Sequence, residues 1–361
     1  MAGVLQNPSP PRQPKSFIDT TYTQSQDLRF TSSKPARQWS TPLAKNLAEV
    51  IATTGPISIA AYMRQCLTSP DGGYYTSQSE GRDQFGQKGD FITSPEISQV
   101  FGELLGIWLV AEWMAQGRRS SGVELIEAGP GRGTLMADIL RTIRNFKSLA
   151  ASIEAVYLVE ASPALRDTQK LLLCGDAPME EIDMGFRSTS KYSNIPIIWC
   201  EDIRFVQDDP SRSPFIFAHE FFDALPIHAF HPQTHPGATI EISPEAQSYA
   251  AEFARRIGGT PLPSAPTSQT TKPRPSGAAL ILDYGPSCTI PSSTLRGIRA
   301  HRLVSPLRAP GRVDLSADVD FTALAHAAVA ASPGVEVHGP VEQGAWLRAM
   351  GGEERVGALS P

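Results

Sequence analysis

The sequence predicts an α/β protein in which helices cover both faces of a mostly parallel β-sheet. Short apolar stretches alternate along the chain with longer segments whose apolar residues recur at helical spacing. This alternation is typical of a parallel sheet, because helices connect its strands and bury both of its faces. The chain has 361 residues, of which 41% are hydrophobic, enough for a large buried core. In such sheets, ligands bind at the carboxyl ends of the strands.

The individual elements follow from local patterns along the chain. Ser94 and Pro95 supply a cap and a first-turn proline, and the apolar residues that follow at helical spacing predict one continuous helix to about Trp108. A strand at 123–128, a glycine turn and a helix then follow. Further strands are predicted at 156–159, 197–199, 215–218 and 279–282. Further helices are predicted at 162–174, 243–257, 320–331 and 342–350.

Two proline-rich stretches set the expected domain boundaries. Residues 1–45 are rich in Pro, Ser, Thr and Gln and carry six basic but only two acidic side chains. This composition predicts a disordered segment and also suits a mitochondrial targeting peptide. The prolines within residues 260–277 predict a surface loop. We therefore expect an N-terminal helical extension at 46–120 and a main domain at 121–361.

Composition also excludes several classes of protein. The net charge of -5 argues against a protein held mainly by nucleic-acid phosphates or anionic lipid. The longest apolar stretch, residues 104–111, is far shorter than a membrane-spanning helix requires. The cysteines are scattered without a C-x-x-C pair, so neither a disulfide framework nor a metal site is predicted. They are Cys66, Cys174, Cys200 and Cys288.

The clearest chemical motif is the turn Glu-Ala-Gly-Pro-Gly-Arg-Gly-Thr that starts at Glu127. Its glycines remove side chains where the backbone must turn sharply and approach a ligand. The G-x-G-x-G spacing differs from that of dinucleotide folds, and no Lys-Ser/Thr follows as in a P-loop. Glu127 would repel a pyrophosphate but suits a cationic group, such as the amino or sulfonium group of S-adenosylmethionine. We predict that Glu127, Gly129, Gly131 and Gly133 bind this cofactor, an ordinary turn being the alternative.

Two further acidic residues follow the next strands. Glu160 closes the strand at 156–159, where a carboxylate can accept both hydroxyls of a ribose. Asp202 follows the strand at 197–199 and could reach an adenine amino group. The alternatives are a surface acid at position 160 and a loop or capping residue at position 202. Three acids at consecutive strand ends beside a glycine turn predict a nucleoside site in the order of a methyltransferase.

Longer motifs extend the pattern over most of the chain, from about Gly55 to Leu359. They include Gly55-Pro-Ile-Ser58, Gly89-Asp-Phe-Ile-Thr-Ser-Pro-Glu-Ile-Ser98, Phe101-Gly-Glu-Leu-Leu-Gly106, Gly129-Pro-Gly-Arg-Gly-Thr-Leu135, His219-Glu-Phe-Phe-Asp-Ala-Leu-Pro226 and Asp318-Val-Asp-Phe321. In these motifs the chain resembles the MidA family of S-adenosylmethionine-dependent methyltransferases. Mitochondrial members of that family are protein arginine methyltransferases required for the assembly of respiratory complex I.

The resemblance implies a fold, a location and a reaction. The fold would be a Rossmann-like class I methyltransferase sheet whose active site includes the N-terminal extension. The location would be the mitochondrial matrix, and the reaction symmetric dimethylation of arginine in a protein partner, a complex I subunit. Compared with the family, the chain is shorter between Phe230 and Ile240 and after Leu359. We therefore expect a shortened C-terminal part with an open sheet edge.

An arginine acceptor also needs carboxylates that orient its guanidinium group. Glu220 and Asp223 directly follow the strand at 215–218, so both are predicted at the ligand edge as catalytic residues. The two phenylalanines between them could exclude water. The alternative is that these rings belong to the core and the acids cap the next turn. Asp90 and Glu96 are further candidates from the N-terminal extension, and His219 is either a base or a packed side chain.

Three functional hypotheses follow from the sequence. The first is an S-adenosylmethionine-dependent protein arginine methyltransferase that acts on a protein partner. The second is a non-catalytic assembly factor that keeps the fold and binds a partner, which the shortened C-terminal part favours. The third, a nucleotide-dependent dehydrogenase, is disfavoured by the spacing of the glycines.

Overall fold

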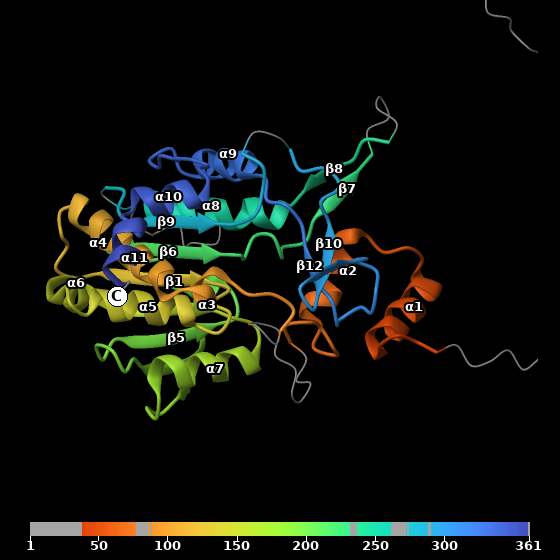
Figure 1. Ribbon diagram of the computed structural model, residues 1–361, viewed down its shortest axis with the longest axis horizontal. Helices are drawn as coiled ribbons and strands as arrows, with labels where there is room; N and C mark the ends of the chain where they lie inside the picture. The colour runs from red at the N-terminus through yellow and green to blue at the C-terminus, as the bar shows by residue number, and fades with distance from the viewer. Residues whose placement is uncertain are drawn as a thin grey trace, which may run out of the picture. The chain divides into compact units, whose positions relative to one another are not determined.

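The computed structural model describes residues 38–76, 86, 89–231, 237–260, 272, 274–287 and 290–359. Most of the segment predicted to be disordered, most of the proline-rich loop and Cys288 lie outside these residues. A seven-stranded sheet with the order β3-β4-β5-β2-β1-β6-β9 forms the centre of the described part (Figure 1). Its strands are β1 (Val123–Ala128), β2 (Ile153–Val159), β3 (Glu180–Ile182), β4 (Gly185–Thr189), β5 (Pro196–Cys200), β6 (Ser213–His219) and β9 (Ala278–Leu282).

Strands β5, β2, β1, β6 and β9 run parallel, whereas β3 and β4 add an antiparallel hairpin at one edge. Strand β9 forms the other edge in the part of the chain that the structure describes. The five parallel strands contain the five that the sequence predicts. The hairpin was not predicted, because β3 and β4 are short and largely exposed or half-buried.

Helices cover both faces of the sheet, because successive residues of a strand point to opposite sides. All six residues of β1 are buried. Leu125 belongs to a core cluster with α4 and α5, and Ile126 belongs to a second cluster with α8 and α9. The helices around the sheet are α4 (Gln99–Ala115), α5 (Thr134–Ile143), α6 (Lys147–Ser152), α7 (Pro163–Cys174), α8 (Pro244–Gly258), α9 (Phe321–Ala331), α10 (Gln343–Ala349) and α11 (Gly352–Leu359). This arrangement is the predicted α/β class.

A smaller group of elements faces the carboxyl ends of the parallel strands (Figure 1). It has its own core, in which Met63 and Tyr74 from the N-terminal extension pack with Ile227 and Leu315. Met63 and Tyr74 thus pack with residues more than 150 positions later in the chain, an arrangement that local periodicity cannot predict. The elements are α1 (Pro42–Thr54), α2 (Ile59–Thr68), β7 (His228–Phe230), β8 (Ile240–Ile242), β10 (Arg296–Arg299), β11 (Arg302–Val304) and β12 (Asp314–Ser316).

Two sequence predictions need correction. The single helix expected from Ser94 is divided into α3 (Ser94–Ile97) and α4, because Ser98 is extended and its hydroxyl caps α4 by accepting the N–H of Val100 at 3.2 Å. Ile97 is consequently 72% exposed instead of buried. Disorder to residue 45 is also wrong at its end, since α1 begins at Pro42. Thr41 caps α1 by accepting the N–H of Ala44 at 2.9 Å.

The structure also bears on membranes and metals. None of the helices in the described ranges is long and apolar enough to cross a membrane. Within the same ranges, no group of three or more His, Cys, Asp and Glu side chains is placed to hold a metal ion.

Candidate active site

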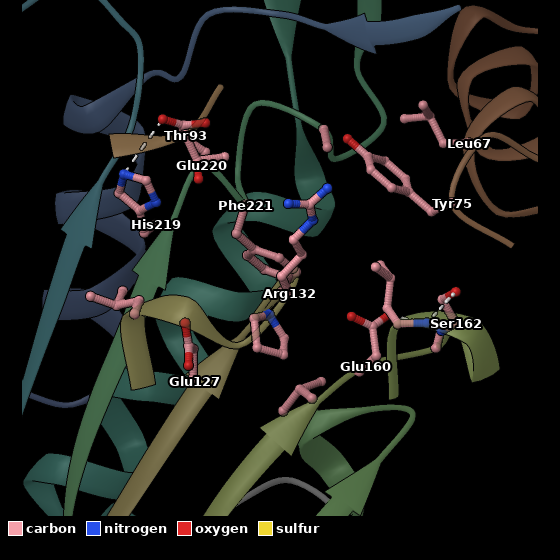
Figure 2. A pocket seen from close by; sticks show the side chains of 18 of the residues that line it. Leu67, Tyr75, Thr93, Glu127, Arg132, Glu160, Ser162, His219, Glu220 and Phe221 are labelled. Atoms are coloured by element: carbon pink, nitrogen blue, oxygen red, sulfur yellow. Dashed lines mark hydrogen bonds and ion pairs between the residues drawn. The ribbon is translucent and has the colours of Figure 1, made fainter. Parts of the chain in front are cut away.

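A cavity of ≈ 270 Å³ lies at the carboxyl ends of β1, β2 and β6. Its wall combines the glycine turn after β1 with residues of the N-terminal extension, among them Tyr75, Thr93 and Glu96. Figure 2 shows Glu127, Glu160 and Glu220 around this space, with the side chain of Arg132 between them. The edge at which ligands bind in parallel sheets is therefore hollow, and several carboxylates surround it.

The glycine turn adopts a backbone that other residues avoid. Gly129, Gly131 and Gly133 have φ angles of 66°, 54° and 83°, in the left-handed region that favours glycine. A Cβ atom on Gly129 would lie 2.7 Å from Cδ2 of Phe221. Gly129 and Gly131 line the cavity. Gly133 lies outside the wall and is the N-terminal cap of α5, and a Cβ atom on it would lie 3.2 Å from Cγ of Gln169.

Glu127 is an acid of the cavity wall with an unpartnered oxygen. Its side chain is buried, and its Oε2 atom has no hydrogen-bond partner among the described residues. Burial, together with the charge of Glu160, raises the pKa of Glu127 to about 8. A buried, unpartnered carboxylate oxygen at the cavity wall suits a ligand cation, since such a cation would stabilise the ionised form.

Glu160 is held in place by a hydrogen-bond network. Its Oε1 accepts the N–H of Ser162 at 2.8 Å, and its Oε2 accepts Nε2 of Gln169 at 3.1 Å. Gln169 also donates to the carbonyl of Gly131 at 2.6 Å, so its side chain links Glu160, at the end of β2, to the glycine turn. Burial raises the pKa of Glu160 to about 7. A carboxylate fixed in this way at the cavity wall could accept hydroxyl groups of a ribose.

Asp202 lies outside the wall of the cavity. It caps the short 3-10 helix Ile203–Phe205, and its two oxygens bind the side chain of Arg204 at 2.9 and 2.7 Å. The bonds from Arg204 hold the pKa of Asp202 below its ordinary value. Glu201, one residue earlier, lines the cavity instead. The structure therefore favours the capping role that the sequence left open for Asp202.

Glu220 lies at the end of β6 and faces the cavity. Its backbone has a φ of 50°, which is strained for a residue with a side chain. Its N–H donates to the carbonyl of Leu282 at 2.9 Å, and its Oε1 accepts the hydroxyl of Tyr284 at 3.1 Å. Burial and the nearby charge of Asp223 raise the pKa of Glu220 to about 7. The fold thus holds this carboxylate in an unusual conformation at the cavity, as functional sites often do.

Asp223 does not line the cavity with Glu220. Its side chain accepts the hydroxyl of Ser316 at 2.9 Å, and burial raises the pKa of its carboxyl. The loop between the two acids is fixed by Asp283, whose Oδ2 accepts the N–H groups of Phe221 and Phe222 at 3.1 and 2.8 Å. Asp223 therefore connects the loop to β12, a placement different from the predicted acceptor site.

Of the remaining candidates, Glu96 and His219 line the cavity and Asp90 does not. Glu96 lies in the wall and forms an ion pair with Arg132, with 3.1 Å between Oε1 and Nη1. Asp90 lies outside the wall, where it accepts the hydroxyl of Tyr74 at 2.9 Å. The side chain of His219 lines the cavity, and burial lowers its pKa to about 4. His219 is therefore neutral at physiological pH, with Nε2 3.5 Å from Oε1 of Glu220.

Sequence reasoning had assigned no role to Arg132. It stands between the second and third glycines of the motif, where an arginine has no distinctive signal. The ion pair with Glu96 depends on α3 of the N-terminal extension, so only the tertiary structure reveals it.

Comparisons with known proteins agree with this geometry. A family profile described as S-adenosyl-L-methionine-dependent methyltransferase matches residues 104–235 and 229–341. The chain belongs to this methyltransferase family. It is 39% identical to the rat protein named "Protein arginine methyltransferase NDUFAF7, mitochondrial", over 88% of this chain and 76% of that one. The human protein of the same name is 38% identical, over 91% of this chain and 78% of that one.

Solved structures show the same fold. A methyltransferase-type protein from Burkholderia thailandensis, crystallised with S-adenosylhomocysteine, has a TM-score of 0.54 and 22% identity. A native structure from the same organism has a TM-score of 0.52, also at 22% identity. Each comparison covers 81% of this chain and 76% of the other. The solved structures confirm the predicted fold, and the family profile confirms the predicted methyltransferase class and its cofactor, S-adenosylmethionine.

The residues present fit this cofactor. Glu127 would bind its amino group, Gly129 and Gly131 would give it room beside the backbone, and Glu160 would accept its ribose hydroxyls. When bound, S-adenosylmethionine supplies a methyl group that is activated by the adjacent sulfonium. The protein's own contribution is to position the donor and acceptor, since a methyl displacement depends mainly on alignment.

Proposed function

We propose that this methyltransferase methylates arginine side chains of a protein partner. The observation that carries the proposal is the place of Glu220, a strained and largely buried carboxylate in the same cavity as Glu127 and Glu160. It stands at the end of β6, a different strand from those that carry the cofactor acids. The names of the rat and human relatives support an arginine acceptor in a protein.

Glu220 would orient the acceptor guanidinium and receive its proton. A guanidinium stays charged in proteins and pairs with a carboxylate through two parallel hydrogen bonds. Its approach would favour the ionised form of Glu220, whose pKa is about 7 without a ligand. As the new N–C bond forms and the S–C bond breaks, the methylated nitrogen must lose a proton. Before the acceptor binds, the pKa of Glu220 is about 7 and that of neutral His219 is about 4, so Glu220 is the stronger base of the two.

The biological setting is proposed on the same basis. The relatives are named mitochondrial, and the basic, acid-poor composition of residues 1–45 fits a targeting peptide. Together with the resemblance to the MidA family, this supports a role in the mitochondrial matrix. The reaction there would be symmetric dimethylation of an arginine in a complex I subunit during assembly.

Two measurements on the purified protein test the proposal. Isothermal titration with S-adenosylhomocysteine should show binding. Incubation with radiolabelled S-adenosylmethionine and isolated complex I subunits should place label in one subunit, and acid hydrolysis should release symmetric dimethylarginine. Cofactor binding without transfer to any subunit would favour the non-catalytic assembly factor. Transfer to a residue other than arginine would reject the assignment of the acceptor.

A further inference from the structure

The smaller group of elements carries an unusual concentration of arginine. Between residues 295 and 313 the sequence contains five arginines and one histidine but neither a lysine nor an acidic residue. The whole chain, in contrast, carries a net charge of -5. Arg299, Arg302 and Arg308 are exposed, and we call these three side chains the arginine surface. Its local charge is opposite to that of the molecule as a whole.

Among the described residues, no acidic side chain forms an ion pair with the arginine surface. Arg296, in contrast, forms an ion pair with Asp318. Arg299 and Arg302 lie directly opposite each other on β10 and β11. Like charges in this position destabilise a hairpin. An external anion bound between the two guanidinium groups would remove that cost.

The surface is fixed next to the active-site cavity. The hairpin turn consists of Ala300 and His301, whose N–H groups donate to Oδ1 and to the carbonyl of Asp90 at 2.8 and 2.9 Å. Phe91, the next residue, lines the cavity. The hydroxyl of Tyr62 also holds this region by donating to the carbonyl of Pro306 at 2.8 Å. A partner bound to the hairpin turn would therefore lie near the part of the cavity wall that contains Phe91.

Apolar side chains accompany the charges. Leu303 is 73% exposed and Leu307 is 71% exposed, and both lie between arginines in the sequence. An interface usually combines such apolar contacts with charged groups, among which arginine is favoured. Arginine is also suited to carboxylates, because its planar guanidinium makes two parallel hydrogen bonds.

We propose that the arginine surface binds an acidic segment of the protein partner, an inference that rests on the proposed protein substrate. Such a segment would supply carboxylates to Arg299 and Arg302 and apolar contacts to the leucines. A long polyanion or an anionic bilayer would also be repelled by the negative charge of the rest of the protein, whereas a short acidic segment can bind the arginines without approaching that charge. The surface would thus favour a target arginine that lies near an acidic segment of the partner.

Fluorescence anisotropy tests this inference with a labelled peptide of glutamate and leucine and an analogue in which glutamine replaces glutamate. The protein should bind the glutamate peptide more tightly, and salt should weaken the binding. The double variant R299E/R302E should bind it about ten-fold more weakly, a modest loss because the contacts are exposed. The control R144E/K147E makes the same charge change at exposed positions beyond the far end of α5 and should bind normally.

Several outcomes would overturn the inference. Equal binding of the two peptides, or unchanged binding by R299E/R302E, would mean that the surface does not recognise carboxylates. Tighter binding of RNA or of phosphatidylserine vesicles, lost in the variant, would assign the surface to those ligands. R299Q/R302Q provides a milder change if reversal of charge disturbs the hairpin. Because binding is measured without methyl transfer, and S-adenosylhomocysteine titration checks the cofactor site, failure here is distinguishable from failure of the proposed function.

Discussion

Substitution of Glu127 by glutamine should change stability and cofactor binding in opposite directions. The carboxyl of Glu127 is buried on β1, and its pKa is raised from 4.5 to about 8. The folded-state pKa lies above the unfolded value, so the protonated carboxyl of Glu127 contributes to the free energy of unfolding. This contribution is fully present below pH 4.5 and is lost as the pH rises through about 8. The complete loss corresponds to about 5 kcal/mol of unfolding free energy.

A comparison of two pH values separates the free energy that is due to ionisation of Glu127 from other effects of the amide substitution. At pH 5.5 only about 1 kcal/mol of this stability has been lost, and at pH 8.5 nearly all of it. Glu127→Gln does not ionise, so its stability relative to the parent protein should improve by about 3 kcal/mol between these two pH values. The same change removes the carboxylate expected to pair with the amino group of the cofactor. We expect S-adenosylhomocysteine to bind more weakly by about 1.5–3 kcal/mol.

Urea unfolding at pH 5.5 and 8.5, with titration of S-adenosylhomocysteine in parallel, measures both effects. Glu124→Gln is a matched control on the same strand, because burial also raises the pKa of Glu124, to about 7, but its side chain does not line the cavity. The control should gain relative stability with pH and keep its cofactor affinity. A stability difference for Glu127→Gln that does not change with pH, or undiminished cofactor affinity, would refute the reasoning.

Three further predictions concern the other parts of the site. Gly131→Val should abolish S-adenosylhomocysteine binding while circular dichroism stays unchanged, because a β-branched side chain resists a φ of 54°; retained affinity would place the site elsewhere. Glu160→Ala should weaken cofactor binding by about 1.5–3 kcal/mol and Glu160→Gln by less, and equal affinities would make Glu160 a bystander. Glu220→Gln should lower turnover at saturating cofactor by up to several orders of magnitude through loss of alignment, whereas Asp223→Asn should mainly alter the urea midpoint; normal turnover by the first variant would remove Glu220 from catalysis.

The sequence was informative where chemistry and local structure coincide. The strand before Gly129 and the helix after Gly133 are each defined by their own apolar pattern, and the glycines between them require positive φ angles. The position of Glu127 and Glu160 at the ends of neighbouring parallel strands then follows from the geometry of the sheet. These predictions needed no contact between distant parts of the chain.

The predicted roles of acidic residues were less accurate where the side chain binds a protein group instead of facing the cavity. Asp202 and Asp223 also follow strands, but Arg204 binds the first and Ser316 the second. The sequence separates Asp223 from Ser316 by 93 residues, so no local pattern could indicate this bond. The ion pair between Glu96 and Arg132 was missed for the same reason. An acid at a strand end is therefore only a candidate until its partners are known.

The charges around the cavity would allow two cationic groups to share one small site, as the proposed function requires. Burial raises the pKa values of Glu127, Glu160 and Glu220, so without ligands these carboxyls are partly protonated near neutral pH and repel one another less. The amino group of the cofactor and the guanidinium of the acceptor would each favour an ionised carboxylate, releasing protons as they bind. Each cation would then be neutralised by its own acid on a separate strand, Glu127 on β1 and Glu220 after β6, so that the two positive groups need not repel each other strongly when the methyl group is transferred.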